Sequence, residues 1–357
     1  MELLQHPQST KPIVVITGVT GYLGSHVLEQ FLKDGTYAVR GTVRDKNNEE
    51  KIAPLRTALG QELFHQLTLV NADLLDPVSI DHAIAGADYV VHTASPLPLK
   101  QPKDENLLIK PAVEGTLAVL RAAHKHKVKR VVITSSLVAI MSPEKELRKE
   151  TYTEQDWSEP KTQDAYGKSK TLAERAAWDF LSKLPSAEKF ELVVINPGAI
   201  LGPTYVNNGF ASGEFMSDIL NGKFPRMPKL MIPVIDVRDV AKAHLLGLKI
   251  KEAAGKRFPL CEKSMWFRQI AHVINQKLPG YNLNEGEMCY CLIKVVSWFD
   301  SSVKFILPIW DTPMYFDVSI TENVLGMKQL ISAEDSIVGI AESLIKQGLV
   351  KDKRRVK

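Results

Sequence analysis

Short apolar runs rich in β-branched residues alternate with longer amphipathic stretches along the first 200 residues of the chain. The short runs predict strands at Ile13–Thr17, Tyr37–Val43, Leu67–Val70, Tyr89–His92, Arg130–Thr134 and Leu192–Ile195. The longer stretches have helical periodicity and lie at Tyr22–Asp34, Pro77–Ala85, Asn106–Lys125 and Ala165–Leu184. Apolar strands separated by helices predict an α/β fold, a doubly wound parallel sheet with helices on both faces.

The pattern changes after Asn196, where prolines and glycines punctuate the chain as far as Pro233. A helix is predicted to begin near Asp236, and a strand is predicted at Arg257–Cys261. The remainder mixes helical stretches with loops. We expect this part to form a smaller C-terminal substrate-binding cap over the carboxyl edge of the sheet, where ligands of such sheets bind.

Three glycines follow the first predicted strand in the spacing G-x-x-G-x-x-G: Gly18, Gly21 and Gly24. Tyr22 and Leu23 open the helix that comes next. Glycines at this place permit a tight turn, a close approach of the backbone to a pyrophosphate, and close packing of helix on strand. The loop therefore predicts a dinucleotide-binding Rossmann domain, which we expect to comprise residues 12–198 with 230–262. Residues 199–229 with 263–350 would form the cap.

The charged residues after the second predicted strand bear on the choice of dinucleotide. Arg44 is the first of them, and its planar guanidinium suits the 2′-phosphate of NADP. Lys51 adds a second cation seven residues on, whereas Asp45 would favour NAD if the strand ended one residue later. The pattern favours NADP(H), with NAD the alternative. At the end of the third strand, Asp73, followed by Leu74, can bind the adenine amino group or cap the next helix.

A tyrosine and a lysine four residues apart, Tyr166 and Lys170, share one face of the fourth predicted helix. An ammonium group beside a phenol favours the phenolate, so this spacing suits a tyrosine that exchanges protons. Ser135 and Ser136 follow a buried strand at the carboxyl edge. We expect one serine to cap the chain as it leaves the strand and the other, Ser136, to hold a substrate oxygen beside Tyr166.

Composition narrows the classes of function. The 357 residues carry a net charge of only +4, which gives no indication of nucleic-acid binding. No apolar run has the length of a membrane span, and the N-terminus lacks a signal-peptide pattern, so a cytoplasmic location is expected. The three cysteines predict no disulfide framework, and Cys289 and Cys291 are expected to be buried thiols rather than half of a metal site.

These motifs together resemble the extended short-chain dehydrogenase/reductases of the NAD-dependent epimerase/dehydratase family. Within that family the chain is similar to dihydroflavonol reductases, cinnamoyl-CoA reductases and fungal aldehyde/ketone reductases. The resemblance spans the glycine loop, Arg44, the Thr93-Ala94-Ser95 segment, the Tyr166–Lys170 helix and the Asp236–Ala241 run, and it extends to a last helix within Ser332–Gly348.

The resemblance implies that Ser136, Tyr166 and Lys170 form the catalytic set of an NADPH-dependent reductase that converts an aldehyde or ketone to an alcohol. It also implies that Arg44 and Lys51 hold the 2′-phosphate and that Lys170 holds the nicotinamide ribose. The turn Pro197, Gly198, Ala199 and Ile200 would contact the nicotinamide amide. The Asp236–Ala241 run is expected to pack the cap onto the sheet.

The details of the resemblance narrow the substrate. Plant dihydroflavonol reductases carry Asn or Asp where this chain has Met141. This difference argues against a flavonoid substrate, because a thioether accepts only weak hydrogen bonds. Phe210, Phe215, Met216 and Phe224 are candidate pocket walls or simple core residues. A hydroxysteroid dehydrogenase, a nucleotide-sugar epimerase and a non-catalytic dinucleotide-binding subunit are the alternative functions. The expected partner is a small carbonyl compound, with the chain a monomer or homodimer.

Overall fold

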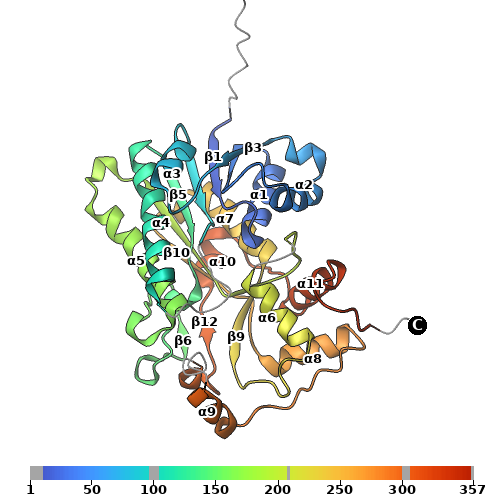
Figure 1. The fold of residues 1–357 in the computed structure, drawn as a ribbon. Coiled ribbons are helices and arrows are strands. Elements are labelled where there is room, and N and C mark those ends of the chain that lie inside the picture. The colour runs from blue at the N-terminus through green and yellow to red at the C-terminus, as the bar shows by residue number, and fades with distance from the viewer. Residues whose placement is uncertain (1–10, 96–103, 207–209, 300–305, 355–357) are drawn as a thin grey trace, which may run out of the picture.

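A seven-stranded parallel sheet forms the centre of the structure, a computed structural model that describes residues 11–95, 104–206, 210–299 and 306–354 (Figure 1). Its strands are β1 (Ile13–Thr17), β2 (Ala38–Val43), β3 (Leu67–Asn71), β4 (Tyr89–His92), β5 (Arg130–Thr134), β7 (Glu191–Pro197) and β10 (Arg257–Leu260). They lie in the order β10-β7-β5-β4-β1-β2-β3, all parallel. This order confirms the predicted doubly wound α/β fold.

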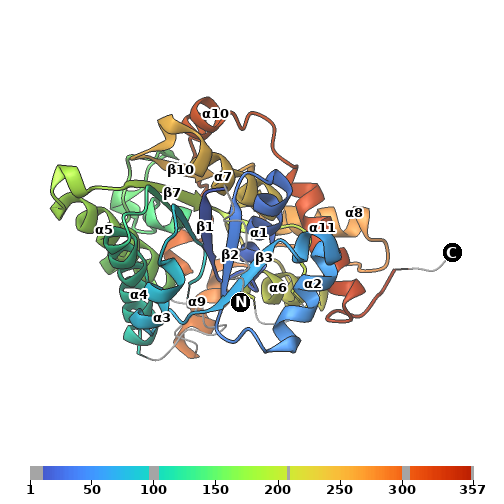
Figure 2. The same ribbon diagram turned by 90° about the horizontal axis from the view of Figure 1, so that it is seen from above.

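Helices cover both faces of this sheet (Figure 2). On one face lie α1 (Tyr22–Asp34), α2 (Glu49–Phe64) and α7 (Val237–Lys249), and on the other α3 (Pro77–Ile84), α4 (Asn106–Lys125) and α5 (Ala165–Lys183). Successive residues of a strand serve opposite faces: Val14 and Ile16 join the core beneath α1 and α7, whereas Val15 joins the core beneath α3 to α5. Both cores are apolar, which is why the strands read as continuous apolar runs.

The sequence analysis identified every strand of this sheet to within two residues at each end, but it missed α2. Pro54 lies inside this helix, and Gly60 breaks its helical geometry with φ of 72°. Both residues are typical of loops, and buried side chains occur at only three of its positions, Ile52, Leu55 and Leu59. The amphipathic signal is therefore weak, and packing on the sheet stabilises the helix instead.

The C-terminal part has a core of its own, built around a three-stranded sheet in the order β11-β9-β8. Its strands are β8 (Ala199–Leu201), β9 (Met231–Asp236) and β11 (Lys263–Trp266). Helices α6 (Ala211–Leu220), α8 (Phe267–Lys277) and α11 (Ala333–Lys346) supply most of its apolar side chains. Met216 is fully buried there and Phe215 and Phe224 pack against Phe267, so these three belong to the core rather than to a pocket wall.

Smaller elements complete the chain. A two-stranded sheet joins β6 (Thr151–Tyr152) to β12 (Tyr315–Phe316), and two further helices are α9 (Tyr290–Phe299) and α10 (Ser319–Leu325). Short 3-10 helices are η1 (Leu137–Ala139), η2 (Lys145–Leu147), η3 (Pro160–Thr162), η4 (Ser186–Glu188), η5 (Lys251–Ala253) and η7 (Leu307–Ile309).

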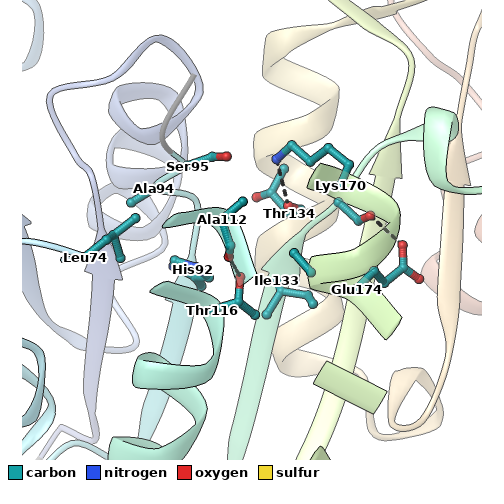
Figure 3. A pocket seen from close by; sticks show the side chains of 12 residues that line it. Leu74, His92, Ala94, Ser95, Ala112, Thr116, Ile133, Thr134, Lys170 and Glu174 are labelled. Carbon is teal, nitrogen blue, oxygen red and sulfur yellow. Dashed lines mark hydrogen bonds between the residues drawn. The ribbon is translucent and has the colours of Figure 1, made fainter. Parts of the chain in front are cut away.

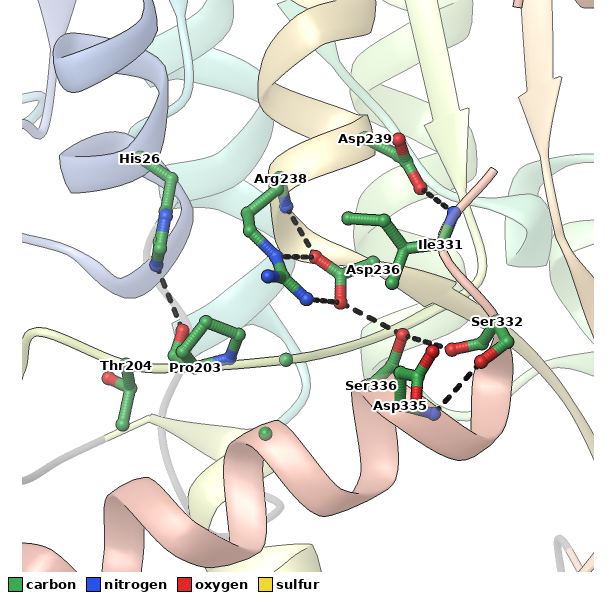
Figure 4. A network of polar contacts seen from close by, with 12 residues as sticks. His26, Pro203, Thr204, Asp236, Arg238, Asp239, Ile331, Ser332, Asp335 and Ser336 are labelled. Carbon is green, nitrogen blue, oxygen red and sulfur yellow. Dashed lines mark hydrogen bonds and ion pairs between the residues drawn. The ribbon is translucent and has the colours of Figure 1, made fainter. Parts of the chain in front are cut away.

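A buried carboxylate connects the C-terminal part to the large sheet (Figure 4). Asp236 caps α7 and binds the guanidinium of Arg238 with both oxygens, at 2.8 and 2.9 Å. The hydroxyl of Ser336 on α11 donates to the same carboxylate at 2.9 Å, and Asp239 accepts from the backbone of Ile331 at 2.7 Å. The Asp236–Ala241 run thus binds α11 and the segment before it to α7, as expected. The residue ranges of the two domains stay a proposal.

The prediction that Cys289 and Cys291 are buried thiols was wrong. Cys261 is buried, but Cys289 and Cys291 are exposed at the start of α9. All three thiols are free. Within the described ranges, no three histidine, cysteine or carboxylate side chains come together as metal ligands, and no helix combines the length and the apolar character needed to cross a bilayer.

Candidate active site

The glycine loop lies at the carboxyl end of β1, where the strand order reverses between β2 and β4. Gly18 has φ of 72°, a conformation that side chains disfavour, and its carbonyl accepts from the backbone N–H of Gly21 at 3.0 Å. A Cβ atom on Gly24 would lie 2.1 Å from the Gly18 carbonyl oxygen. The first turn of α1 is therefore pressed against the loop, and its free N–H groups face the crevice in which dinucleotides bind.

This contact predicts the effect of Gly24→Ala. We expect the added methyl group to displace the loop and to weaken NADPH binding more than about tenfold, because a phosphate hydrogen bond from a misplaced N–H costs about 1.5–3 kcal/mol. Gly35→Ala, at the other end of α1, is the control. Gly35 has φ of 68°, so the control should lower stability by about 1 kcal/mol and leave the NADPH Kd unchanged. Equal Kd values for Gly24→Ala and the wild type would show that the loop does not bind the phosphates.

Tyr22 and Leu23 contribute backbone rather than side chains to this loop. The Tyr22 ring is buried against Phe210, with ring centroids 4.6 Å apart, and its hydroxyl donates to the Gly202 carbonyl at 2.9 Å. Leu23 packs against the apolar core. The side chain of Tyr22 thus connects α1 to the C-terminal part, and only its N–H remains for a cofactor.

The segment after β4 packs against the glycine loop. Thr93 donates its hydroxyl to the Thr17 carbonyl at 2.5 Å, and the Ala94 N–H donates to the Thr17 hydroxyl at 3.1 Å. The Thr17 hydroxyl in turn lies 2.8 Å from Nδ1 of the buried His92, within hydrogen-bonding distance of that ring. Burial and the charge of Lys170 lower the pKa of His92 to about 3, which keeps the ring neutral.

A pocket opens between this segment and α5 (Figure 3). Leu74, Ala94 and Ser95 line one side, and Thr134, Lys170 and Glu174 line the other. The structure thus brings three of the predicted cofactor contacts to the same cavity as the predicted catalytic lysine. Pro96, the next residue of the matched motif, lies outside the described residues.

The predicted phosphate and adenine contacts lie at the ends of β2 and β3. Strand β2 ends at Val43, so Arg44 comes directly after it, exposed and without an ion pair to any residue that the structure describes. The Asp45 carboxylate instead accepts from the Asn47 backbone at 2.9 Å, in a turn that leads to Lys51 in the first turn of α2. The condition that favoured NAD, a strand extending one residue further, is not met.

Asp73 does not cap α3, which corrects one of its two predicted roles. Asp76 caps that helix by accepting from the Val78 N–H at 3.1 Å. The Asp73 carboxylate accepts from the Leu75 N–H at 2.9 Å, within the turn. Binding of the adenine amino group remains a prediction for Asp73.

Helix α5 begins at Ala165, with Asp164 as its cap, and presents Tyr166 and Lys170 toward the carboxyl ends of β4 and β5. Tyr166 is hydrogen-bonded to Ser136, and Lys170 Nζ lies 3.5 Å from the Thr134 carbonyl oxygen. The structure therefore brings the three predicted catalytic residues into one place. Tyr166 and Lys170 are surrounded by protein but keep some exposed surface, as side chains that border an open pocket do.

The pKa of Tyr166 differs from the prediction made for the Tyr166–Lys170 pair. Burial raises the pKa of Tyr166, the hydrogen bond with Ser136 lowers it, and Asp164 raises it further. Burial lowers the pKa of Lys170 to about 8, and the charge of Glu174 raises it. The pKa of Tyr166 is therefore raised overall in the protein alone, and not lowered as expected. Tyr166 is a phenol at neutral pH, which is the form that donates a proton.

Ser135 and Ser136 differ in role from the expected pair. Ser136 caps η1 by accepting from the Val138 N–H at 3.3 Å, and the same side chain is hydrogen-bonded to Tyr166. Ser135 instead donates its hydroxyl to the buried carboxylate of Glu174 at 2.5 Å. Sequence reasoning missed Glu174, although it continues the four-residue spacing of Tyr166 and Lys170.

The Pro197–Ile200 turn connects β7 to β8 beside this site. The Ser136 hydroxyl lies 3.4 Å from the Pro197 carbonyl oxygen. A Cβ atom on Gly198 would lie 2.5 Å from the Pro233 carbonyl oxygen, so only glycine allows β9 to approach here. Ala199 and Ile200 begin β8. The turn lies beside Ser136, and its contact with nicotinamide remains a prediction.

The sheet order, the glycine loop and the grouped Ser136, Tyr166 and Lys170 define the class of dinucleotide-binding short-chain dehydrogenase/reductase proteins. Comparison with protein families agrees: residues 14–259 match the NAD dependent epimerase/dehydratase family. The chain belongs to this family, which confirms the resemblance seen in its motifs.

Characterised relatives are similar over most of the chain. Anthocyanidin reductase of Arabidopsis thaliana is 34% identical over 298 residues, which cover 79% of this chain and 84% of that protein. Cinnamoyl-CoA reductase 2 of the same plant is 36% identical over 280 residues, covering 76% and 79%. The crystal structure of yeast methylglyoxal/isovaleraldehyde reductase Gre2 complexed with NADPH superposes with a TM-score of 0.78 at 26% identity, covering 94% of this chain and 98% of that one.

Proposed function

We propose that this protein is an NADPH-dependent carbonyl reductase that converts an aldehyde or ketone to an alcohol. The observation that carries the proposal is the grouping of Ser136, Tyr166 and Lys170 at the carboxyl ends of parallel strands, beside the glycine loop. The relatives include an anthocyanidin reductase, a cinnamoyl-CoA reductase and a methylglyoxal/isovaleraldehyde reductase, which supports a reductase but leaves the substrate open.

Each of the three residues has a distinct part in the proposal. Tyr166, a phenol at neutral pH, donates a proton to the substrate oxygen. Ser136 holds that oxygen beside the phenol. The Lys170 ammonium binds the nicotinamide ribose and stabilises the phenolate that forms when the proton leaves. NADPH, when bound, supplies the hydride to the carbonyl carbon.

The residues present fit such a cofactor. Glycine at position 24 lets the first turn of α1 lie directly against the Gly18 carbonyl, which places the start of that helix, a favourable site for a pyrophosphate, at the glycine loop. Arg44 stands exposed at the end of β2, where the adenosine ribose of a dinucleotide lies, and favours NADPH over NADH. Met141 packs against an apolar cluster that includes Leu137 and Ile140. It presents no strong hydrogen-bond acceptor, so a less polar carbonyl compound is the better candidate than a flavonoid.

The proposal is tested by following NADPH oxidation with a panel of aldehydes, ketones, flavonoids, hydroxysteroids and acyl-CoA thioesters. Turnover with small aldehydes or ketones is the expected result. Protein that binds NADPH but oxidises it with none of these compounds would instead be a non-catalytic dinucleotide-binding subunit.

The pKa of Lys170 predicts how the reaction depends on pH. Its pKa of about 8 lies below the ordinary 10.5, so the ammonium is present below pH 8 and is lost above it, while Tyr166 keeps its proton throughout because its pKa is raised. We expect kcat for carbonyl reduction to be level below pH 8 and to fall about tenfold for each further pH unit. A pH profile of kcat at saturating NADPH measures this fall above pH 8, which is the high-pH limb of the profile. A rate that is constant from pH 6 to pH 10 would contradict it.

A further inference from the structure

A buried ion pair lies one helical turn below Lys170. Glu174 on α5 is completely buried, and its Oε1 accepts from Arg257 Nε on β10 at 2.5 Å. Oε2 of the same carboxylate accepts from the hydroxyl of Ser135 at 2.5 Å and from the side-chain amide of Asn196 at 2.8 Å. The carboxylate thus connects α5 to the ends of three strands: β5, β7 and β10.

The partners of Glu174 lead directly to the residues that contact the substrate. Ser135 is the neighbour of Ser136 in the chain, and the Asn196 amide also donates to the Ser136 carbonyl at 3.3 Å. The hydrogen bonds of Ser135 and Asn196 to one carboxylate therefore restrain the short segment from which the Ser136 hydroxyl projects toward Tyr166. A hydroxyl displaced by about 1 Å costs as much as a hundredfold in rate.

Arg257 extends the same restraint to the loop between η1 and α5. Its guanidinium donates to the carbonyl oxygens of Glu154 at 2.8 Å and Asp156 at 2.5 Å, and it lies 3.9 Å from the centroid of the Trp157 ring. These contacts fix the guanidinium beside Glu174 and provide the charged partner that a buried carboxylate requires.

Charge gives Glu174 a second role, toward Lys170. Tyr166, Lys170 and Glu174 follow one another at four-residue spacing and so share one face of α5. His92 from β4 and His244 from α7 also approach this face, His244 through its 2.7 Å contact with Thr134, but burial keeps both rings neutral, with pKa values of about 3 and 4. Arg257 is paired. Glu174 is thus the group whose charge raises the pKa of Lys170.

We propose that Glu174, held by Arg257, is a positioning residue of the reductase, which fixes the Ser135–Ser136 segment and places a negative charge one helical turn from Lys170. This inference rests on the proposed function. Stability alone does not account for such a pair, because apolar residues of similar size often replace a buried ion pair without loss of stability.

The test compares Glu174→Gln with the wild type. Glutamine keeps the shape and one acceptor oxygen but removes the charge, so the high-pH limb of the kcat profile should move to lower pH by about one unit. Below that limb, kcat should fall with little change in the KM for NADPH. Glu191→Gln is the matched control, because Glu191 pairs with Arg130 at 2.7 Å at the opposite end of β5 and β7. The control should leave the pH profile unchanged.

A second measurement separates this inference from the proposed function. In protein labelled with ¹³C at the lysine side chains, the Lys170 resonance, assigned with Lys170→Met, should titrate near pH 8 and at lower pH in Glu174→Gln. This holds even if no carbonyl substrate is found. An unchanged titration midpoint in Glu174→Gln would overturn the inference, whatever its thermal stability.

A double variant keeps the test decisive if Glu174→Gln does not fold. Glu174→Met combined with Arg257→Leu removes both charges without leaving either one unpaired. We expect it to fold and to show a shift of the Lys170 titration to lower pH that is smaller than in Glu174→Gln, because the more distant Arg257 cation is also removed. A wild-type midpoint in this variant would show that the pair only supports the fold.

Discussion

Replacing Tyr166 by phenylalanine is expected to lower kcat for carbonyl reduction by about 10³-fold, within the range that general acid catalysis contributes. The variant loses the phenol that donates the proton and the hydrogen bond between Tyr166 and Ser136. The ring itself remains, so α5 and the position of Lys170 should not change. The Kd for NADPH should therefore stay within about threefold of the wild-type value, because that change corresponds to less than 1 kcal/mol.

Single-turnover oxidation of bound NADPH is the measurement that isolates this chemical step. Tyr89→Phe is the matched control, since Tyr89 is the first residue of β4 and so lies at the amino ends of the parallel strands, away from the carboxyl ends that hold the site. It should retain wild-type turnover. Near-normal turnover in Tyr166→Phe would show that another group donates the proton and would remove the basis of the proposed mechanism.

The second large effect is expected at the cofactor's phosphate. Arg44→Asp should change the ratio of kcat/KM for NADPH to that for NADH by at least about 100-fold in favour of NADH. Hydrogen bonds between ionised groups contribute about 1.5–3 kcal/mol, and the new carboxylate also repels the phosphate. The reason lies in the position of Arg44, which follows the last residue of β2 directly and has an exposed guanidinium.

The control for this variant is Arg56→Asp, which makes the same change of charge. Arg56 lies further along α2, paired with Glu49 and 5.1 Å from the centroid of the Phe64 ring. It should leave the cofactor preference within about threefold of the wild type, a change of less than 1 kcal/mol. A ratio that is the same in Arg44→Asp and the control would place the phosphate site elsewhere.

The local sequence pattern was sufficient to identify the strands of the large sheet and the main candidate residues of the site. Strands such as β1 and β5 are apolar on both faces, and the glycine loop lies between a strand and a helix, so neighbouring residues alone identify them. The four-residue spacing of Tyr166 and Lys170 places them on one helix face regardless of what surrounds that helix. Helix α2 was missed because Pro54 and Gly60 obscure it, and it is held by packing rather than by its own pattern.

Only the tertiary structure decided how these groups are charged and held. Ionisation depends on burial and on neighbours distant in sequence, which is why the pKa of Tyr166 is raised rather than lowered in the protein alone. Glu174 and Arg257 are 83 residues apart, and no local pattern indicates that they meet. The sequence by itself thus determined the family and the candidate residues for its chemistry, because these depend on short spacings along single elements. The fold decided their protonation and support, because both arise from desolvation and contacts between elements far apart in the chain.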